Sequence, residues 1–319
     1  MAFQRPARAR RRAALTSGPA PGLERLALRS RLEPLYRACN VGGAVADPVE
    51  AVRAYTDPAD REVAGFIAAG LAFGRVASIL GAVTRVLRCM GPSPAAFVRR
   101  FDPGRDARRL DGVVHRWIRG RDLSALLLVL RRMLDGAGSI EGFFLSGDDP
   151  GAPDIEPGLE SFCARARDID VRPVYGRRAA RPGVHAFFPL PSAGSACKRL
   201  NLYLRWMVRR DAVDLGVWTG VSPARLVIPL DVHVARVGQC LGLTAYRAPG
   251  WRMAASITSA LRALDPLDPV RYDFALCRLG MGGLCGFRTP AGDSRCPLRG
   301  VCRPRPRKPP GSRRSSGRR

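Results

Sequence analysis

The chain has 319 residues, of which 46% are hydrophobic and 25% charged, a composition typical of a soluble globular protein with one or two lobes. No run approaches the roughly 20 apolar residues of a membrane span, so we expect a cytoplasmic protein without a membrane partner. The arginine-rich first fifteen residues are not followed by the apolar core of an export signal. A transit peptide has a similar composition, so organelle targeting stays an alternative.

The formal net charge of +26 indicates a polyanionic partner. Half of it falls at the ends, because positions 1–15 hold five basic residues and positions 303–319 hold eight, with no acid in either segment. We expect segments 1–22 and 303–319 to be disordered basic tails, the second able to contact phosphates. The body carries the other half, which favours nucleic acid over an anionic membrane surface.

Apolar residues recur at helical spacing along most of the chain. Positions 60–90 predict two helices with a break near Gly74, and the pattern returns at 123–134, 200–208, 232–241 and 254–264. Segments 135–157 and 171–189 are rich in Gly, Pro, Asp and Arg, and we expect loops or insertions there. No alternating pattern predicts a strand, so the expected fold class is all-α.

The segment from Pro189 to Arg199 predicts a turn that leads into a helix. Its small residues allow close approach, and the free N–H groups of a helix start can bind a phosphate. Lys198 follows this turn and is one of two lysines against 51 arginines. An amine, unlike a guanidinium, can lose its proton and attack an electrophilic carbon. Lys198 is therefore a candidate nucleophile, and the alternative is a chance lysine at a helix start.

A second motif surrounds Asp231, which follows Pro-Leu and precedes the helical run Val-His-Val-Ala-Arg-Val. An aspartate at this place is a good helix N-cap, and the same carboxylate can also take a proton from a neighbouring amine. We interpret His233 as a structural residue.

Four of the nine cysteines lie close together near the C-terminus, with the spacing C-x7-C-x10-C-x5-C. Four thiolates suit an iron-sulfur cluster or a zinc ion. The other five are scattered and do not form the framework of a disulfide-rich domain, so a reducing compartment is expected. The candidate ligands are Cys277, Cys285, Cys296 and Cys302.

The hairpin from Gly194 to Lys198, the segment around Asp231 and the cysteine run together resemble the helix-hairpin-helix (HhH-GPD) DNA glycosylase superfamily, in its endonuclease III-like branch. Over residues 45–285 the chain resembles more closely an uncharacterised bacterial family placed there, of the DUF2400 type. Two departures stand out. Ala196 replaces the second glycine of the hairpin, and 33 positions separate Lys198 from Asp231, so an extra loop around Trp218 is expected at 211–225.

The resemblance implies a bilobal all-α fold, with a helical barrel lobe at 56–225 and a cluster lobe made of 23–55 and 226–302. It implies a monomeric, nucleoid-associated base excision repair enzyme, a DNA N-glycosylase and abasic-site (AP) lyase. Lys198 would attack the sugar of a damaged nucleotide in double-stranded DNA with the help of Asp231, and the four-cysteine loop would hold a [4Fe-4S] cluster, with zinc as the alternative. The implied DNA contacts are Gly194, Ser195, Ala196 and Arg199, with Phe73 and Arg75 near the space left by a flipped base.

Two other functions stay open on the sequence. The first is a non-catalytic module that binds structured or damaged nucleic acid through the same fold. The second is a redox-sensing cluster protein.

Overall fold

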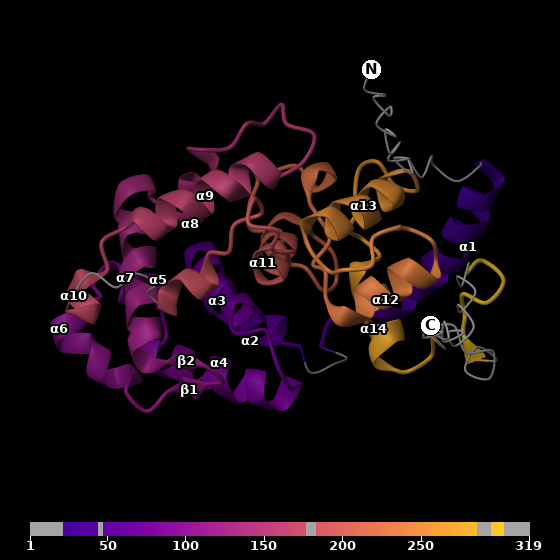
Figure 1. Ribbon diagram of the computed structural model, residues 1–319. Coiled ribbons are helices and arrows are strands. Elements are labelled where there is room, and N and C mark those ends of the chain that lie inside the picture. The colour runs from indigo at the N-terminus through magenta and orange to yellow at the C-terminus, as the bar shows by residue number, and fades with distance from the viewer. Residues whose placement is uncertain (1–21, 44–46, 177–182, 286–294, 303–319) are drawn as a thin grey trace, which may run out of the picture.

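A computed structural model of the protein describes residues 22–43, 47–176, 183–285 and 295–302 (Figure 1). Helices make up 59% of the structure and strands 2%, which confirms the expected mainly helical class. Within the described residues, no helix is long and apolar enough to cross a membrane. The predicted tails lie outside these residues, except for Gly22, at which the first helix begins.

The first helices confirm the predicted pair and its break. Asp57 caps α3 by accepting hydrogen bonds from the N–H groups of Ala59 and Asp60. Gly74, with a φ of +105°, lies in the turn between α3 and α4, where a residue with a side chain would be strained. The elements of this part are α1 (Gly22–Cys39), α2 (Val49–Arg53), α3 (Pro58–Gly70), α4 (Val76–Met90) and α5 (Pro94–Arg99).

The middle of the chain contains elements that the sequence pattern did not predict. A two-stranded antiparallel hairpin, β1 (Val114–His115) and β2 (Ile118–Arg119), precedes α7. The expected loop at 135–157 contains α8, and the one at 171–189 contains α10 and η2, so both expectations were wrong in part. The remaining elements are α6 (Pro103–Asp106), η1 (Ala107–Leu110), α7 (Gly120–Ala137), α8 (Ile140–Leu145), α9 (Glu156–Asp168), α10 (Arg172–Tyr175) and η2 (Gly183–Phe187).

The last third provides the helices that carry the predicted motifs, and their bounds agree with the apolar periodicity. Gly280 lets α14 approach α12 closely, because a Cβ there would lie 2.7 Å from the Cβ of His233. The elements are α11 (Lys198–Val208), η3 (Pro223–Arg225), α12 (Val232–Cys240), α13 (Trp251–Arg262) and α14 (Asp273–Met281). Figure 1 shows α11 near the centre, with α4 to α10 on one side and α1, α12, α13 and α14 on the other.

The segment 211–225 between α11 and α12 is mostly loop, as predicted, and two buried contacts fix it. The indole N–H of Trp218 donates to Glu62 on α3 at 2.9 Å. Arg205 and Arg209 of α11 both form ion pairs with buried Asp214. Arg205 also pairs with Asp273 at the start of α14, so one network of charges joins α11, the loop and α14. Because each buried charge has a partner, the cost of desolvation is offset.

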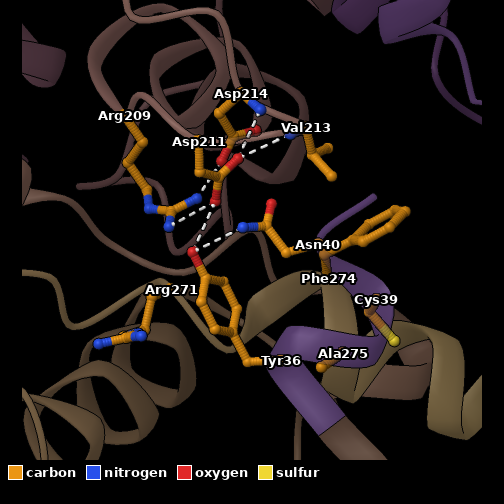
Figure 2. A pocket seen from close by; sticks show the side chains of 10 residues that line it. All are labelled: Tyr36, Cys39, Asn40, Arg209, Asp211, Val213, Asp214, Arg271, Phe274 and Ala275. Carbon is orange, nitrogen blue, oxygen red and sulfur yellow. Dashed lines mark hydrogen bonds and ion pairs between the residues drawn. The ribbon is translucent and has the colours of Figure 1, made fainter. Parts of the chain in front are cut away.

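The first helix is tied to the same loop (Figure 2). The Tyr36 hydroxyl donates to Asp211 at 3.1 Å and accepts from the Asn40 amide at 3.1 Å. The cavity among these residues and α14 measures about 10 Å³, which is space for about one water molecule. It is too small for a ligand, and the residues around it serve to connect α1, the loop and α14.

Candidate functional site

The predicted turn before Lys198 is present. The N–H of Gly194 donates to the carbonyl of Pro191 at 2.8 Å, and Gly194 has a φ of +80°, in the region that favours glycine. Its carbonyl accepts a hydrogen bond from the Trp251 N–H at 3.4 Å, which seats the turn on the start of α13. Gly194 is exposed, and no atom lies within 4 Å of the place where a Cβ would be. The predicted phosphate contact at Gly194 therefore has open space in front of it.

The end of the turn is held by local polar contacts. Cys197 has a φ of +47° and is the N-cap residue of α11, and its N–H donates to the Ser195 hydroxyl at 3.1 Å. The Asn201 amide donates to the carbonyl of Ala196 at 3.2 Å. These contacts orient the backbone so that Lys198 is the first residue of α11, in agreement with the predicted helix start. Ser195 and Ala196 are half-buried.

Asp231 caps α12, as predicted. One carboxylate oxygen, Oδ1, accepts from the N–H groups of His233 at 2.8 Å and Val234 at 2.7 Å. The other oxygen, Oδ2, accepts from the thiol of Cys277 on α14 at 3.2 Å. The cap therefore fixes the carboxylate and turns Oδ2 toward α14.

Lys198 lies near enough to the same thiol for its charge to influence the pKa of Cys277. Burial raises the pKa of Cys277, the negative charges of Asp231 and Asp273 raise it further, and the positive charge of half-buried Lys198 opposes them. The structure thus brings Lys198 and Asp231, which are 33 positions apart, to one place around Cys277. Asp273 has a cation of its own in Arg205, with which it forms an ion pair.

Asp273 was not among the predicted site residues. It is the first residue of α14, and burial raises its pKa to about 6, against the opposing charge of Arg205. The negative charge of nearby Asp231 contributes to this raised pKa of Asp273, so the two acids interact. The sequence signal that could have found it was Arg205, a cation in the apolar pattern of α11 that needs a buried acid as partner.

Two further predicted DNA contacts meet at the turn between α3 and α4. The Arg199 guanidinium lies 5.0 Å from the Phe73 ring centre and donates to the carbonyls of Gly70, at 2.6 Å, and Ala186. Burial lowers its pKa to about 10. Arg199 thus connects the start of α11 to the α3–α4 turn through contacts within the protein. Its contact with DNA stays a prediction. Arg75 is exposed at the N-cap of α4.

The four predicted metal ligands are not gathered in the part of the chain that the structure describes. Cys277 contacts Asp231 and, at 3.7 Å, the sulfur of Met281. Cys285 and Cys296 are buried, and Cys302 is half-buried. Among the described residues, no three Cys, His, Asp or Glu side chains are placed to hold a metal ion. Residues 286–294, between the second and third cysteines, lie outside that part. The cluster at these four cysteines therefore stays a prediction.

Fold and site together define a mainly helical protein in which a lysine after a tight turn shares a site with a helix-capping aspartate. The chain belongs to the DUF2400 family, described as proteins of unknown function, whose sequence model matches residues 47–282. The matched region contains both motifs and α2 to α14. No curated protein and no solved structure matches the chain significantly.

Proposed function

We propose that the protein is a DNA repair enzyme of the helix-hairpin-helix superfamily, a bifunctional DNA N-glycosylase and AP lyase. The observation that carries the proposal is the convergence of Lys198 and Asp231 on Cys277. Lys198 is the only lysine among the residues that the structure describes, in a chain with 51 arginines. The turn before it is exposed at Gly194, where a DNA phosphate can approach.

The proposed reaction begins with attack of the uncharged Lys198 amine on the sugar C1′ of a damaged nucleotide. The bond from C1′ to the base breaks, and the base leaves with the electron pair and takes up a proton. Ring opening gives a Schiff base between Lys198 and the sugar, and β-elimination then breaks the bond from C3′ to its oxygen. Water releases the lysine.

Asp231 has two roles in this proposal. Its Oδ1 is occupied by two backbone N–H groups, so the carboxylate cannot rotate freely. Its Oδ2 can either accept the proton of the Lys198 ammonium group or, while it stays ionised, offset positive charge that develops at C1′. Asp273, bonded to Arg205, is not assigned a chemical step.

The bilobal arrangement is part of the proposal. A barrel lobe at 56–225 and a cluster lobe of 23–55 and 226–302 would hold double-stranded DNA across the site, as a monomer in the nucleoid. The contacts of α1 and of α12 with α14 support the second lobe. The excess of basic residues in the body supports DNA as partner.

Covalent trapping tests the reaction. Borohydride reduces a Schiff base to a stable amine, so we expect a cross-link between the protein and a duplex that contains an abasic site or a damaged base. Lys198→Ala should abolish the cross-link. The chain offers a matched control in Lys308→Ala, which removes the other lysine and should leave trapping unchanged.

Trapping that is absent in the wild type, or equal in Lys198→Ala, contradicts the lyase. Salt-sensitive binding that survives in Lys198→Gln without turnover on any lesion would favour the non-catalytic alternative.

The four-cysteine site also stays a proposal, with Cys277, Cys285, Cys296 and Cys302 as ligands of a [4Fe-4S] cluster or, alternatively, zinc. In a cluster loop of this kind the metal would stabilise the fold. Metal analysis of the isolated protein should find iron and sulfide in equal amounts, or zinc alone. Cys302→Ser should lower the content, and Cys163→Ser, a buried thiol of α9, should not. A protein without either metal, purified without air, contradicts the site.

A further inference from the structure

An exposed tryptophan lies at the β1–β2 hairpin. Trp117 is 60% exposed, whereas the other three tryptophans of the chain, Trp206, Trp218 and Trp251, are at most 5% exposed. A tryptophan buries more apolar area than almost any other side chain, and exposed ones are enriched where a partner binds. The exposed ring of Trp117 therefore indicates a surface at which a partner binds.

The ring of Trp117 is held in place by a neighbouring aromatic side chain. It stacks on Phe73, with ring centres 4.5 Å apart and planes at 21°. Phe73 is held in turn by the Arg199 guanidinium and by the edge of His115, whose ring centre lies 4.6 Å away. His115 also hydrogen-bonds through Nε2 to the carbonyl of Phe73 at 2.9 Å. One aromatic surface is thus built by the α3–α4 turn and the hairpin together.

The surroundings of this aromatic pair are positively charged. Positions 73–91 and 112–121 contain no acid, and Arg75, Arg85, Arg116 and Arg119 are exposed. Gly74 makes room for Arg116, because a Cβ there would lie 3.0 Å from the Arg116 Nε. Beside the pair is an open cavity of about 370 Å³, lined by Ser78, Gly81, Ala82, Arg85, Val113, Val114, His115 and Arg116. Its two arginines suit a phosphate at the mouth of the cavity.

We infer that Phe73 and Trp117 form a stacking platform for an unpaired nucleobase of DNA, with Arg85 and Arg116 as contacts to the adjoining phosphate. A planar aromatic face beside arginines is the combination that binds unpaired bases without regard to sequence. In a paired duplex the base faces are covered by their neighbours, so the platform selects DNA with a gap, an abasic site or an extruded base.

The platform adjoins the proposed catalytic site. Arg199 follows Lys198 in the chain and contacts Phe73, so a single residue links Lys198 to the aromatic pair. The inference rests on the proposed function, which identifies DNA as the partner. It adds that the protein binds an unpaired base and the adjoining phosphate.

Tryptophan fluorescence tests the inference directly, because Trp117 is the only tryptophan with an exposed ring. Titration with a single-stranded 12-nucleotide oligothymidine should quench the emission, and a fully paired duplex of the same length should quench it much less. Trp117→Ala should weaken binding of the single strand roughly tenfold, and Trp117→Phe, which keeps a ring, by less than about threefold. Leu267→Ala, which removes an exposed apolar side chain between α13 and α14, is the control and should bind as the wild type does.

Absence of quenching, or equal binding by Trp117→Ala and the wild type, overturns the inference. Concentration-dependent self-association that Trp117→Ala removes, without any effect of DNA, would instead assign the surface to a second copy of the chain. The result is separable from the proposed function. Lys198→Ala should lose borohydride trapping and keep the quenching, whereas Trp117→Ala should lose the quenching and need roughly tenfold more protein to trap the same fraction of the duplex.

Discussion

Asp231 combines two tasks in one side chain, and substitutions can separate them. Oδ1 completes the N-terminal turn of α12, and Oδ2 faces Cys277 in the lysine site. An asparagine retains a capping oxygen but has no charge, whereas an alanine has neither. The two variants therefore distinguish a structural aspartate from one that acts in the reaction.

We expect Asp231→Ala to lower the free energy of unfolding by about 1 kcal/mol and Asp231→Asn by only a few tenths. Both should reduce borohydride trapping strongly, because the carboxylate charge that the proposed reaction uses is lost. Denaturant unfolding and trapping on an abasic duplex are the two measurements. If Asp231→Asn traps as well as the wild type, Asp231 is a cap alone.

At this scale the sequence named two residues of the candidate sites, and two others emerge from the structure alone. Lys198 and Asp231 could be predicted because each lies in a local pattern, a turn before a helix and a cap before a helix. Trp117 and Asp273 could not, since their significance depends on partners far along the chain. Trp117 is notable for its contact with Phe73, 44 positions earlier, and Asp273 for its bond to Arg205.

The α3–α4 turn and the β1–β2 hairpin depend on each other through Gly74. Its positive φ disfavours any side chain, and a Cβ would press on Arg116. We expect Gly74→Ala to lower the free energy of unfolding by about 1 to 2 kcal/mol. The matched control is Gly81→Ala within α4, where a Cβ meets no atom within 4 Å and alanine should stabilise the helix by up to about 1 kcal/mol. Equal effects of the two substitutions in urea unfolding would contradict this interpretation of Gly74.

Helix α8 shows why part of the expected loop at 135–157 was wrong. Its first N–H groups, of Ile140 and Glu141, donate to Glu62 of α3 at 2.9 and 2.6 Å. Ser139 caps the same end by accepting from Gly142. A pattern of neighbouring residues cannot predict a helix whose cap lies 78 positions away. The composition of the segment instead favoured a loop. Long amphipathic helices such as α4 and α7 were predictable because their own periodicity specifies the buried face.

On the scale of the whole molecule, polar contacts hold the loop after α11 to distant parts of the chain, and Asp211 belongs to this network. Burial raises the pKa of Asp211, but the charge of Arg209 and the N–H groups of Asp214 and Val213 outweigh it, and the pKa is lowered overall. A carboxyl group whose pKa is lower in the folded state stabilises the protein above its unfolded pKa of about 4. This contribution is lost as the pH falls through the lower folded value.

We therefore expect Asp211→Asn to be less stable than the wild type at pH 7, by at least about 1 kcal/mol. The difference should shrink as the pH falls below about 4, where the wild-type carboxyl also becomes neutral. Urea unfolding of both proteins between pH 7 and pH 3 measures it. A difference that stays constant over that range would mean that the charge of Asp211 contributes nothing.

The position of α1 has a consequence for synthesis of the chain. Glu33 accepts hydrogen bonds from Tyr272 and Arg271, and the first of these contacts spans 239 positions. At translation rates of roughly 5 to 20 residues per second, the first helix waits about 10 to 50 s before its partner has been made. During that interval α14, which packs against α1 in the finished protein, has not yet been made. The nascent chain thus has an early helix that a chaperone can bind before its partner is available.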